Sequence, residues 1–280
     1  MLPHSKGPKI VKSTGVDLTL GETHMAETLG ALRMKTKFAV LPAAASLFAV
    51  MSLSGCMTAG PNPQDPYEDF NRQMFAFNEG LDKAVIEPVA YGYRAVTNEP
   101  VRESVGNFTH NLGEPLTFVN HVLQGKLPDA GATFGRFVLN TTIGIAGVFD
   151  PASSLGLAKT DEDFGQTLGV WGVQSGPFLV LPVLGPTTPR DIIGRGGDAA
   201  LNPLNYPEFE NDDSIRVGIA ALGGINAREG AIEAVDELRN QIDPYTTLRR
   251  LYGRTRAADI GIPYIEPNDA QEVPEDELDF

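Results

Sequence analysis

The sequence predicts a mostly α-helical protein with a single main domain. Over much of the chain apolar residues recur every three or four positions, as they do on one face of a helix. In the first half of the domain no stretch alternates between apolar and polar residues with the period of two that is typical of a half-buried strand. Asp-Pro pairs and glycines, which often start and end helices, separate the periodic segments. We expect this helical domain to span residues 65–260.

The first predicted helix begins at Asp65-Pro66, an acidic N-cap followed by proline at the first helical position. Pro88 is expected to interrupt it before a short continuation. Its apolar face comprises five residues at helical spacing: Phe70, Met74, Phe77, Leu81 and Val85.

Two further helices are predicted before residue 126. Asn98 suits the start of the first, and Gly113-Glu114-Pro115 is expected to break it. The second covers residues 116–123 and has Gly125 as its cap. In the C-terminal third, residues 215–225 form another helical face with a kink at Gly223-Gly224, and Asp243-Pro244 starts a last helix.

The only cysteine lies at the end of a secretory signal pattern. Residues 34–37 are cationic, residues 38–53 are apolar or small, and the run closes on Leu53-Ser54-Gly55-Cys56. This apolar run is shorter than the roughly 20 residues of a spanning helix. The site resembles the bacterial lipobox, so Cys56 is expected to be acylated and to become the mature N-terminus. An ordinary signal peptide followed by a buried cysteine is the alternative.

These assignments divide the N-terminal part of the chain. Residues 1–33 are interpreted as a mis-called start or a leader, residues 34–55 as the signal peptide, and residues 56–64 as a tether. Removing residues 1–55 takes six of the 22 Lys and Arg and three of the 36 Asp and Glu, so the net charge changes from −14 to about −17. So acidic a chain argues against binding nucleic acid, whose phosphates require a basic patch.

Two apolar stretches in the middle carry many glycines or prolines. Residues 132–149 contain three glycines, with a fourth just before them, and residues 177–189 contain four prolines. We therefore expect the second stretch to form neither a regular helix nor a central strand. Such segments are either buried connections or, in a lipid-anchored protein, parts that contact the membrane. Residues 261–280 are strongly acidic and are predicted to form a disordered tail.

The mature chain offers little for catalysis, and no cofactor or metal site is predicted. Its two histidines, His110 and His121, are expected to be separated by the break at residues 113–115, which argues against a metal pair. Ser175 misses the G-x-S-x-G pattern of a nucleophile elbow by one position. The run Gly194–Asp198 has two interpretations, a phosphate cradle or a place of close packing, and the second is favoured.

The order of sequence blocks resembles that of the MlaA (VacJ) family of outer-membrane phospholipid-transport lipoproteins. The blocks follow one another in family order and cover most of residues 65–252. They are DPYEDFNRQMFAFN (65–78), NFTHNLGEP (107–115), VNHVLQGK (119–126), FGRFVLNTTIGIAGVFDPA (134–152), FGQTLGVWGVQSGPFLVLPVLGPTTPRD (164–191), GGDAALNP (196–203) and DPYTTLRRLY (243–252).

The resemblance implies a helical ring in the inner leaflet of the outer membrane, facing the periplasm, around an amphipathic channel. It implies no enzymatic activity: the protein would remove mislocalised phospholipid from the outer leaflet, pass it to a periplasmic carrier of the MlaC type, and associate with a trimeric porin. Met57 after Cys56 is similarly in keeping with outer-membrane sorting. A scaffold lipoprotein that bridges porins and envelope proteins without transporting lipid is the alternative.

By the same resemblance, two groups of residues become candidate sites. The loop that borders the lipid path would include Gly165, Gly169, Gly172, Gly176 and Pro177. The apolar surface that faces the membrane would include Phe134, Phe137, Ile143, Ile145 and Phe149.

Overall fold

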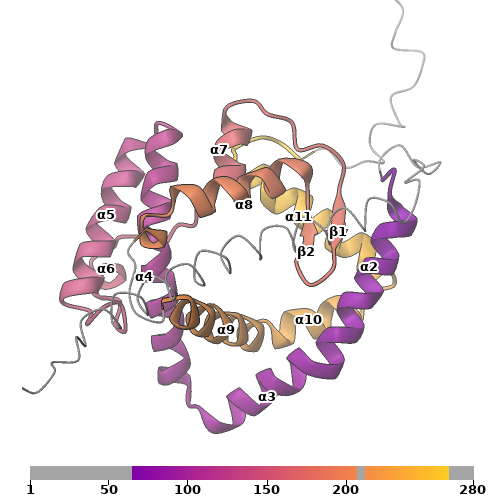
Figure 1. The fold of residues 1–280 in the computed structure, drawn as a ribbon, viewed down its shortest axis with the longest axis horizontal. Coiled ribbons are helices and arrows are strands. Elements are labelled where there is room, and N and C mark those ends of the chain that lie inside the picture. Colours follow the sequence, from indigo (N-terminus) through magenta and orange to yellow (C-terminus); the bar gives the residue numbers. More distant parts are fainter. Residues whose placement is uncertain (1–64, 207–211, 265–280) are drawn as a thin grey trace, which may run out of the picture. The chain divides into compact units, whose positions relative to one another are not determined.

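The computed structural model describes residues 65–206 and 212–264, all within Thr58–Phe280, the second of the two units into which the chain divides (Figure 1). Cys56, the predicted signal peptide and tether, and residues 265–280 of the predicted tail lie outside the described residues. The described part is mostly helical, as predicted, with one short antiparallel pair of strands.

The elements follow one another with short connections. In chain order they are α2 (Glu68–Leu81), the π-helical turn η1 (Asp82–Ile86), α3 (Glu87–Val96), α4 (Glu99–Leu123), α5 (Leu127–Thr142), α6 (Pro151–Ser154), α7 (Phe164–Val170), β1 (Leu179–Leu181), β2 (Gly185–Thr187), α8 (Pro189–Leu201), the 3₁₀ turn η2 (Pro203–Asn205), α9 (Asp212–Gly230), α10 (Ile232–Arg239) and α11 (Pro244–Asp259).

The contacts between these elements close on themselves. From α2 they lead through η1 to α3, on to α9, and then to α4. Helix α4 also packs on α5 and touches α7 and α8, and α8 follows directly from β2 (Figure 1). The hairpin β1–β2 completes the circuit because β1 packs on α2, while α10 and α11 connect α9 to β2.

Helix α4 corrects the prediction of a break at Gly113-Glu114-Pro115. It is continuous over 25 residues with Pro115 inside it. Proline removes one backbone hydrogen bond from a helix interior, but this helix packs along α5 on one side and α9 on another. That tertiary packing outweighs the local preference. The predicted start at Asn98 is confirmed, since its side chain accepts from the backbone N–H of Val101 at 3.1 Å.

The start of α2 also differs from the prediction. Asp65 does not cap the helix, which begins at Glu68. Its side chain is instead fully buried and accepts from Arg249 Nη1 at 2.9 Å, from Asn71 Nδ2 at 3.1 Å and from the Tyr245 hydroxyl. The interruption expected at Pro88 is the π-helical turn η1, which ends just before it. Asp65 therefore joins the first helix to the last one.

Helices α4 and α5 reverse the polarity of a water-soluble core. The buried residues of α4 are all polar, and most of those of α5 are polar too: Asn111, Glu114, Thr117, Asn120 and His121 on α4, and Thr133, Arg136 and Asn140 beside Ala130 on α5. The large apolar residues of α5, including Phe134 (56% exposed) and Val138 (41% exposed), lie on its outer face. Residues 132–142, part of the first glycine-rich stretch, are helical, and their polar face has hydrogen-bonded partners.

Glycines bring α7 and α8 into close contact. A Cβ on Gly194 of α8 would lie 2.5 Å from the backbone nitrogen of Gly165 on α7, and a Cβ on Gly197 would lie 2.2 Å from the Phe164 ring. The favoured interpretation of residues 194–198 as a packing site is therefore confirmed. Gly223 and Gly224 lie within the continuous helix α9, and a Cβ on Gly223 would lie 3.2 Å from Thr109 Cγ2 on α4.

Candidate functional site

Residues 175–188 contribute to the walls of two cavities. One, here called the apolar cavity, has a volume of about 390 Å³ and is lined by residues of α2, η1, β1, β2, α9, α10 and α11. The other, here called the arginine cavity, has a volume of about 320 Å³ and is lined by Ser175, Gly176, Phe178, Thr188, Arg190, Arg249, Tyr252, Gly253, Arg256, Ala257, Ile260, Ile262, Pro263 and Tyr264. Cavities of this size can hold part of a small amphiphile.

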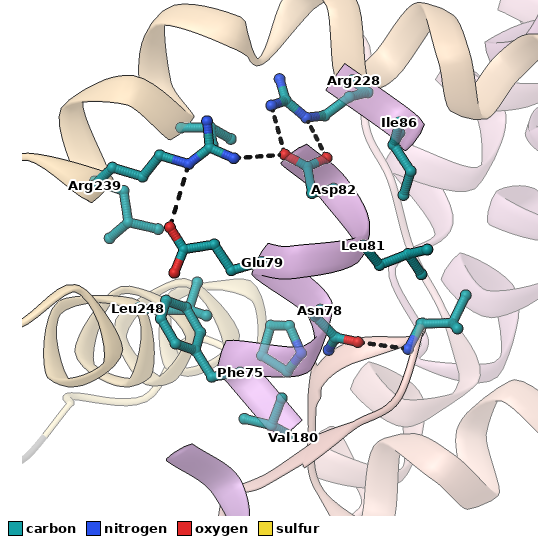
Figure 2. A pocket seen from close by; sticks show the side chains of 15 residues that line it. Phe75, Asn78, Glu79, Leu81, Asp82, Ile86, Val180, Arg228, Arg239 and Leu248 are labelled. Carbon is teal, nitrogen blue, oxygen red and sulfur yellow. Dashed lines mark hydrogen bonds and ion pairs between the residues drawn. The ribbon is translucent and has the colours of Figure 1, made fainter. Parts of the chain in front are cut away.

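Two asparagines hold the hairpin against α2. Asn71 donates to the Phe178 carbonyl at 3.0 Å and accepts from the Val180 N–H at 2.8 Å. Asn78, two helical turns later, donates to the Leu181 carbonyl at 2.9 Å and accepts from the Val183 N–H at 2.7 Å (Figure 2). These side chains replace the partner strand that β1 lacks on this edge. The hairpin's attachment therefore depends on two side chains seven residues apart.

Charged groups close one end of the apolar cavity (Figure 2). The carboxylate of Asp82 accepts from Arg228 Nε at 2.8 Å and Nη2 at 2.7 Å, and from Arg239 Nη2 at 2.8 Å. The hydrogen bonds from Arg228 hold the pKa of Asp82 below its usual range. Phe75, Val180 and Leu248 supply apolar wall. The apolar cavity thus combines an apolar wall with a charged end.

The arginine cavity differs because basic side chains line it directly. Arg190, Arg249 and Arg256 all contribute to its wall, and no carboxylate does so among the residues described. Their acidic partners lie behind them: Arg249 donates to Asp65, and Arg256 donates to Asp163 at 2.6 Å and to Asp191 at 2.7 Å. The cavity therefore presents positive charge beside apolar residues.

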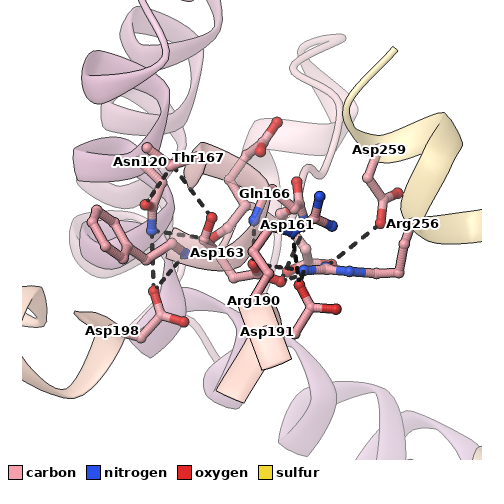
Figure 3. Close-up of polar contacts among 12 residues, drawn as sticks. Asn120, Asp161, Asp163, Gln166, Thr167, Arg190, Asp191, Asp198, Arg256 and Asp259 are labelled. Carbon is pink, nitrogen blue, oxygen red and sulfur yellow. Dashed lines mark hydrogen bonds and ion pairs between the residues drawn. The ribbon is translucent and has the colours of Figure 1, made fainter. Parts of the chain in front are cut away.

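A polar network behind this wall joins four helices (Figure 3). Asp163 caps α7 by accepting from the Gln166 N–H at 2.7 Å and also accepts from Arg256 of α11. Asp198 of α8 accepts from the Phe164 N–H at 2.8 Å and from Asn120 of α4 at 3.3 Å. Burial raises the pKa of Asp198. The network fixes the positions of the arginines relative to α4, α7 and α8.

Both histidines lie on helix α4, which is continuous, so the break expected between them at residues 113–115 is absent. His110 pairs with Glu114 at 3.1 Å and with Asp161 at 3.4 Å, whereas His121 meets the Thr160 hydroxyl at 3.1 Å. Neither lines either cavity. In the part of the chain that the structure describes, no cluster of His, Cys, Asp and Glu is suited to hold a metal ion.

Replacing His110 with glutamine should destabilise the protein in a pH-dependent way. Asp161 first, and then Glu114, raise the pKa of His110 to about 9, above an unfolded value of about 6.5. The stabilisation is therefore complete below pH 6.5 and is lost as the pH rises through 9. We expect a loss of about 1.5–3 kcal/mol near pH 7, the range for hydrogen bonds to charged groups, and almost none near pH 10.5.

Thermal melting of the two proteins between pH 7.5 and 10.5 checks this. His121→Gln is the matched control on the same helix, because burial lowers the pKa of His121 and leaves it neutral throughout that range. Its effect should not vary with pH there. An effect of His110→Gln that is equally constant would contradict the prediction.

The predicted loop residues divide into two groups. Gly165 and Gly169 lie in helix α7 rather than in a loop, and they allow close approach: a Cβ on Gly169 would lie 2.8 Å from Arg190 Nη1. Gly172 and Gly176 have φ of 89° and 74° and lie in the loop, followed by Pro177. Gly176 lines the arginine cavity.

The predicted membrane-facing residues gather on α5 and the turn after it. Phe134, Ile143, Ile145 and Phe149 are each more than half exposed, and Phe137 is half-buried. No helix among the described residues has both the length and the apolar character that spanning a bilayer requires. The sequence interpretation missed the arginine cavity, although Arg249 and Arg256 are seven residues apart and thus share a face of α11.

Comparison with known proteins shows which family the chain is similar to. A family model described as MlaA lipoprotein matches residues 63–259. A protein of Rickettsia felis is 39% identical over 212 residues, which cover 75% of this chain and 82% of that protein. The Escherichia coli protein named intermembrane phospholipid transport system lipoprotein MlaA is 38% identical over 213 residues, which cover 71% of this chain and 81% of that protein.

A solved structure described as the structural basis for maintenance of bacterial outer membrane lipid asymmetry agrees in fold. It superposes with a TM-score of 0.63 at 36% sequence identity, covering 70% of this chain and 98% of that chain. Sequence and fold lead to the same result: this chain belongs to the MlaA lipoprotein family.

Proposed function

We propose that this protein is the lipoprotein of an intermembrane phospholipid transport system that maintains lipid asymmetry of the outer membrane. The relative from Escherichia coli carries that transport name, and the similar solved structure concerns that asymmetry. In this proposal the chain is anchored through Cys56, takes mislocalised phospholipid from the outer leaflet and passes it to a soluble periplasmic carrier beside a trimeric porin.

One observation of the fold carries this proposal, the reversed polarity of α4 and α5. Their shared interface is polar and ion-paired, while Phe134, Val138 and Ile143 face outward. Apolar side chains outside and polar ones inside suit a helix pair that lies in lipid, where polar groups must find partners within the protein. The closed circuit of helix contacts supports a passage within the domain.

The physical task explains why both wall types are needed. Moving a two-chain phospholipid through water exposes about 30 methylenes at about 0.8 kcal/mol each, or more than 20 kcal/mol. Moving its charged headgroup through hydrocarbon is costly as well. A path with apolar residues on one side and arginines on the other lowers both barriers without breaking a bond, so no catalytic group is required.

Mass spectrometry of the purified protein tests the proposal directly. We expect one mass shift for the acyl groups on Cys56 and co-purified phospholipid in about equimolar amount. In cells that lack the protein, phospholipid should accumulate in the outer leaflet. Normal asymmetry in such cells, with no bound lipid on the protein, would leave only the scaffold alternative.

Replacing Gly172 with leucine should impair transport beyond its effect on stability. Gly172 has φ of 89° and no neighbour within 4 Å of an added Cβ, so a side chain there projects into open space beside the loop. The left-handed conformation costs about 1–2 kcal/mol for a residue with a side chain. The measurement is outer-leaflet phospholipid in cells with matched protein abundance.

Gly156→Leu is the matched control. Gly156 has φ of 83° and equally open surroundings, but it follows α6 and lies outside the loop between α7 and β1. The two variants should share the backbone strain and differ in lipid transport. Equal transport in both variants would remove the loop around Gly172 from the lipid path.

A further inference from the structure

Arg249 lines the arginine cavity, and one edge of its guanidinium has no partner within the protein. Its Nη1 donates to Asp65 at 2.9 Å, while its buried Nε has no hydrogen-bond partner and no acceptor meets Nη2 among the residues described. The N–H bonds of Nε and Nη2 are parallel and form the fork that binds two oxygens of a carboxylate or phosphate. The side chain is otherwise enclosed, at 14% exposure.

The same edge is closed in the apolar cavity. There Arg228 uses Nε and Nη2 on the two oxygens of Asp82, at 2.8 and 2.7 Å. Arg228 is thus already saturated along that edge by the protein itself, whereas Arg249 is not. The unpaired edge of Arg249 distinguishes the arginine cavity from the apolar cavity.

The surroundings of Arg249 are suited to an anion. Arg190 and Arg256 line the same cavity, and the buried Nε of Arg256 also lacks a partner. The contacts that hold Arg190 are long, 3.4 Å to Asp191 and 3.4 Å to the Val173 carbonyl. The carboxylates behind these arginines fix their orientation without entering the cavity wall. Preorganised guanidinium groups of this kind favour a tetrahedral oxyanion.

The rest of the cavity wall favours an anion that carries an apolar group. Phe178, Ile260 and Ile262 present apolar surface, and Ser175 and Thr188 add hydroxyl groups. Inorganic phosphate would leave the apolar part uncovered, while a neutral glyceride would leave the fork unpaired. At about 320 Å³ the cavity accommodates a headgroup and the beginning of its chains rather than a whole lipid.

We propose that the arginine cavity binds the phosphodiester of a phospholipid, with the guanidinium of Arg249 donating to its oxygens and the apolar wall contacting the first carbons of the chains. This proposal rests on the proposed function and names the part of the lipid that the protein recognises. Arg190 and Arg256 supply further positive charge to the same phosphate.

Binding of a soluble short-chain lipid tests it. The probe is dihexanoylphosphatidylglycerol, titrated calorimetrically into the purified acylated full chain in a phosphate-free nonionic detergent. Arg249→Lys keeps the charge but replaces the fork by a point charge. We expect its affinity to fall about tenfold or more, as for loss of a charge-assisted hydrogen bond. Arg72→Lys is the control, because Arg72 pairs bidentately with Asp243 outside both cavities.

A second variant tests the same cavity independently if Arg249→Lys does not fold. Ile262 lines the cavity and is 53% exposed, so Ile262→Glu can place a carboxylate at the wall without disturbing a packed core. It should weaken phospholipid binding about tenfold or more, whereas Ile262→Gln should weaken it far less. Far-UV circular dichroism confirms folding of each variant.

Competition distinguishes the sources of phosphate. Dihexanoylglycerol, which lacks the phosphate, should bind at least about tenfold more weakly than the phospholipid. Inorganic phosphate that displaces the lipid at equal concentration would overturn the lipid assignment. Unchanged binding by Arg249→Lys and Ile262→Glu would overturn the cavity assignment while leaving transport intact. If the wild type binds no phospholipid at all, the proposed function itself fails.

Discussion

Replacing Arg136 with alanine is expected to lower the free energy of unfolding by about 3–5 kcal/mol, the range for removing one partner of a buried ion pair. Arg136 is fully buried on α5 and donates from Nε to Glu114 at 2.8 Å. Its Nη1 and Nη2 reach the Leu157 carbonyl and Asp150. Without the guanidinium, the buried carboxylate of Glu114 loses its main compensating charge. Denaturant unfolding followed by circular dichroism measures the loss.

Two comparisons isolate burial as the cause. Lys83→Ala removes the partly exposed ion pair that Lys83 of η1 forms with Glu79 of α2, and it should cost only about 0.3–0.5 kcal/mol. Combining Arg136→Met with Glu114→Gln removes both charges, and it should recover at least about 1 kcal/mol relative to Arg136→Ala. A loss no larger than that of Lys83→Ala would show that the polar interface does not stabilise the pair α4 and α5.

Replacing Cys56 with alanine should abolish lipoprotein processing and anchoring in the outer membrane. If Cys56 carries the acyl chains, each buried methylene contributes about 0.8 kcal/mol to membrane binding, and stable attachment requires more than one chain. The variant should remain an unprocessed precursor or a mislocalised form, and outer-membrane asymmetry should be lost with it. Metabolic labelling with a palmitate analogue checks this, since the alanine variant should carry no label.

Two further variants control for general damage to export. Ser54→Ala keeps a small residue in the same motif and should be processed normally. Deleting residues 1–33, so that synthesis starts at Met34, should leave export and function unchanged. Label retained on the alanine variant would refute Cys56 as the acylation site.

Local sequence signals predicted those helix ends that depend only on neighbouring residues. Asn98 and Asp243 accept from backbone N–H groups three positions ahead, and Gly125 has the positive φ of a residue just past a helix. The same signals failed at Pro115 and Asp65. In both cases contacts with distant helices outweigh a local preference: α4 stays continuous against α5 and α9, and Asp65 pairs with Arg249 rather than capping α2.

The candidate site was predictable only in part. The family resemblance implied a loop that includes Gly172 and Gly176, and both lie in a loop with the positive φ that favours glycine. The same prediction included Gly165 and Gly169, but these lie in helix α7, where glycine allows α7 to pack closely against α8. The pairing of Asn71 and Asn78 with β1 left a usable signal, a seven-residue spacing on one helix. The hairpin itself, among four prolines, left none.

The sequence by itself determined the helical class, the lipobox-like motif at Cys56 and the order of blocks by which the chain resembles its family. Only the tertiary structure decided which face of each helix is inside. Periodicity marks an apolar face but not its direction, since such a face turns inward in water and outward in lipid. The buried pair Arg136–Glu114 and the exposed Phe134 give the direction for α5. Arg190 and Arg249, 59 positions apart, meet in one cavity only because folding packs α8 and α11 around it.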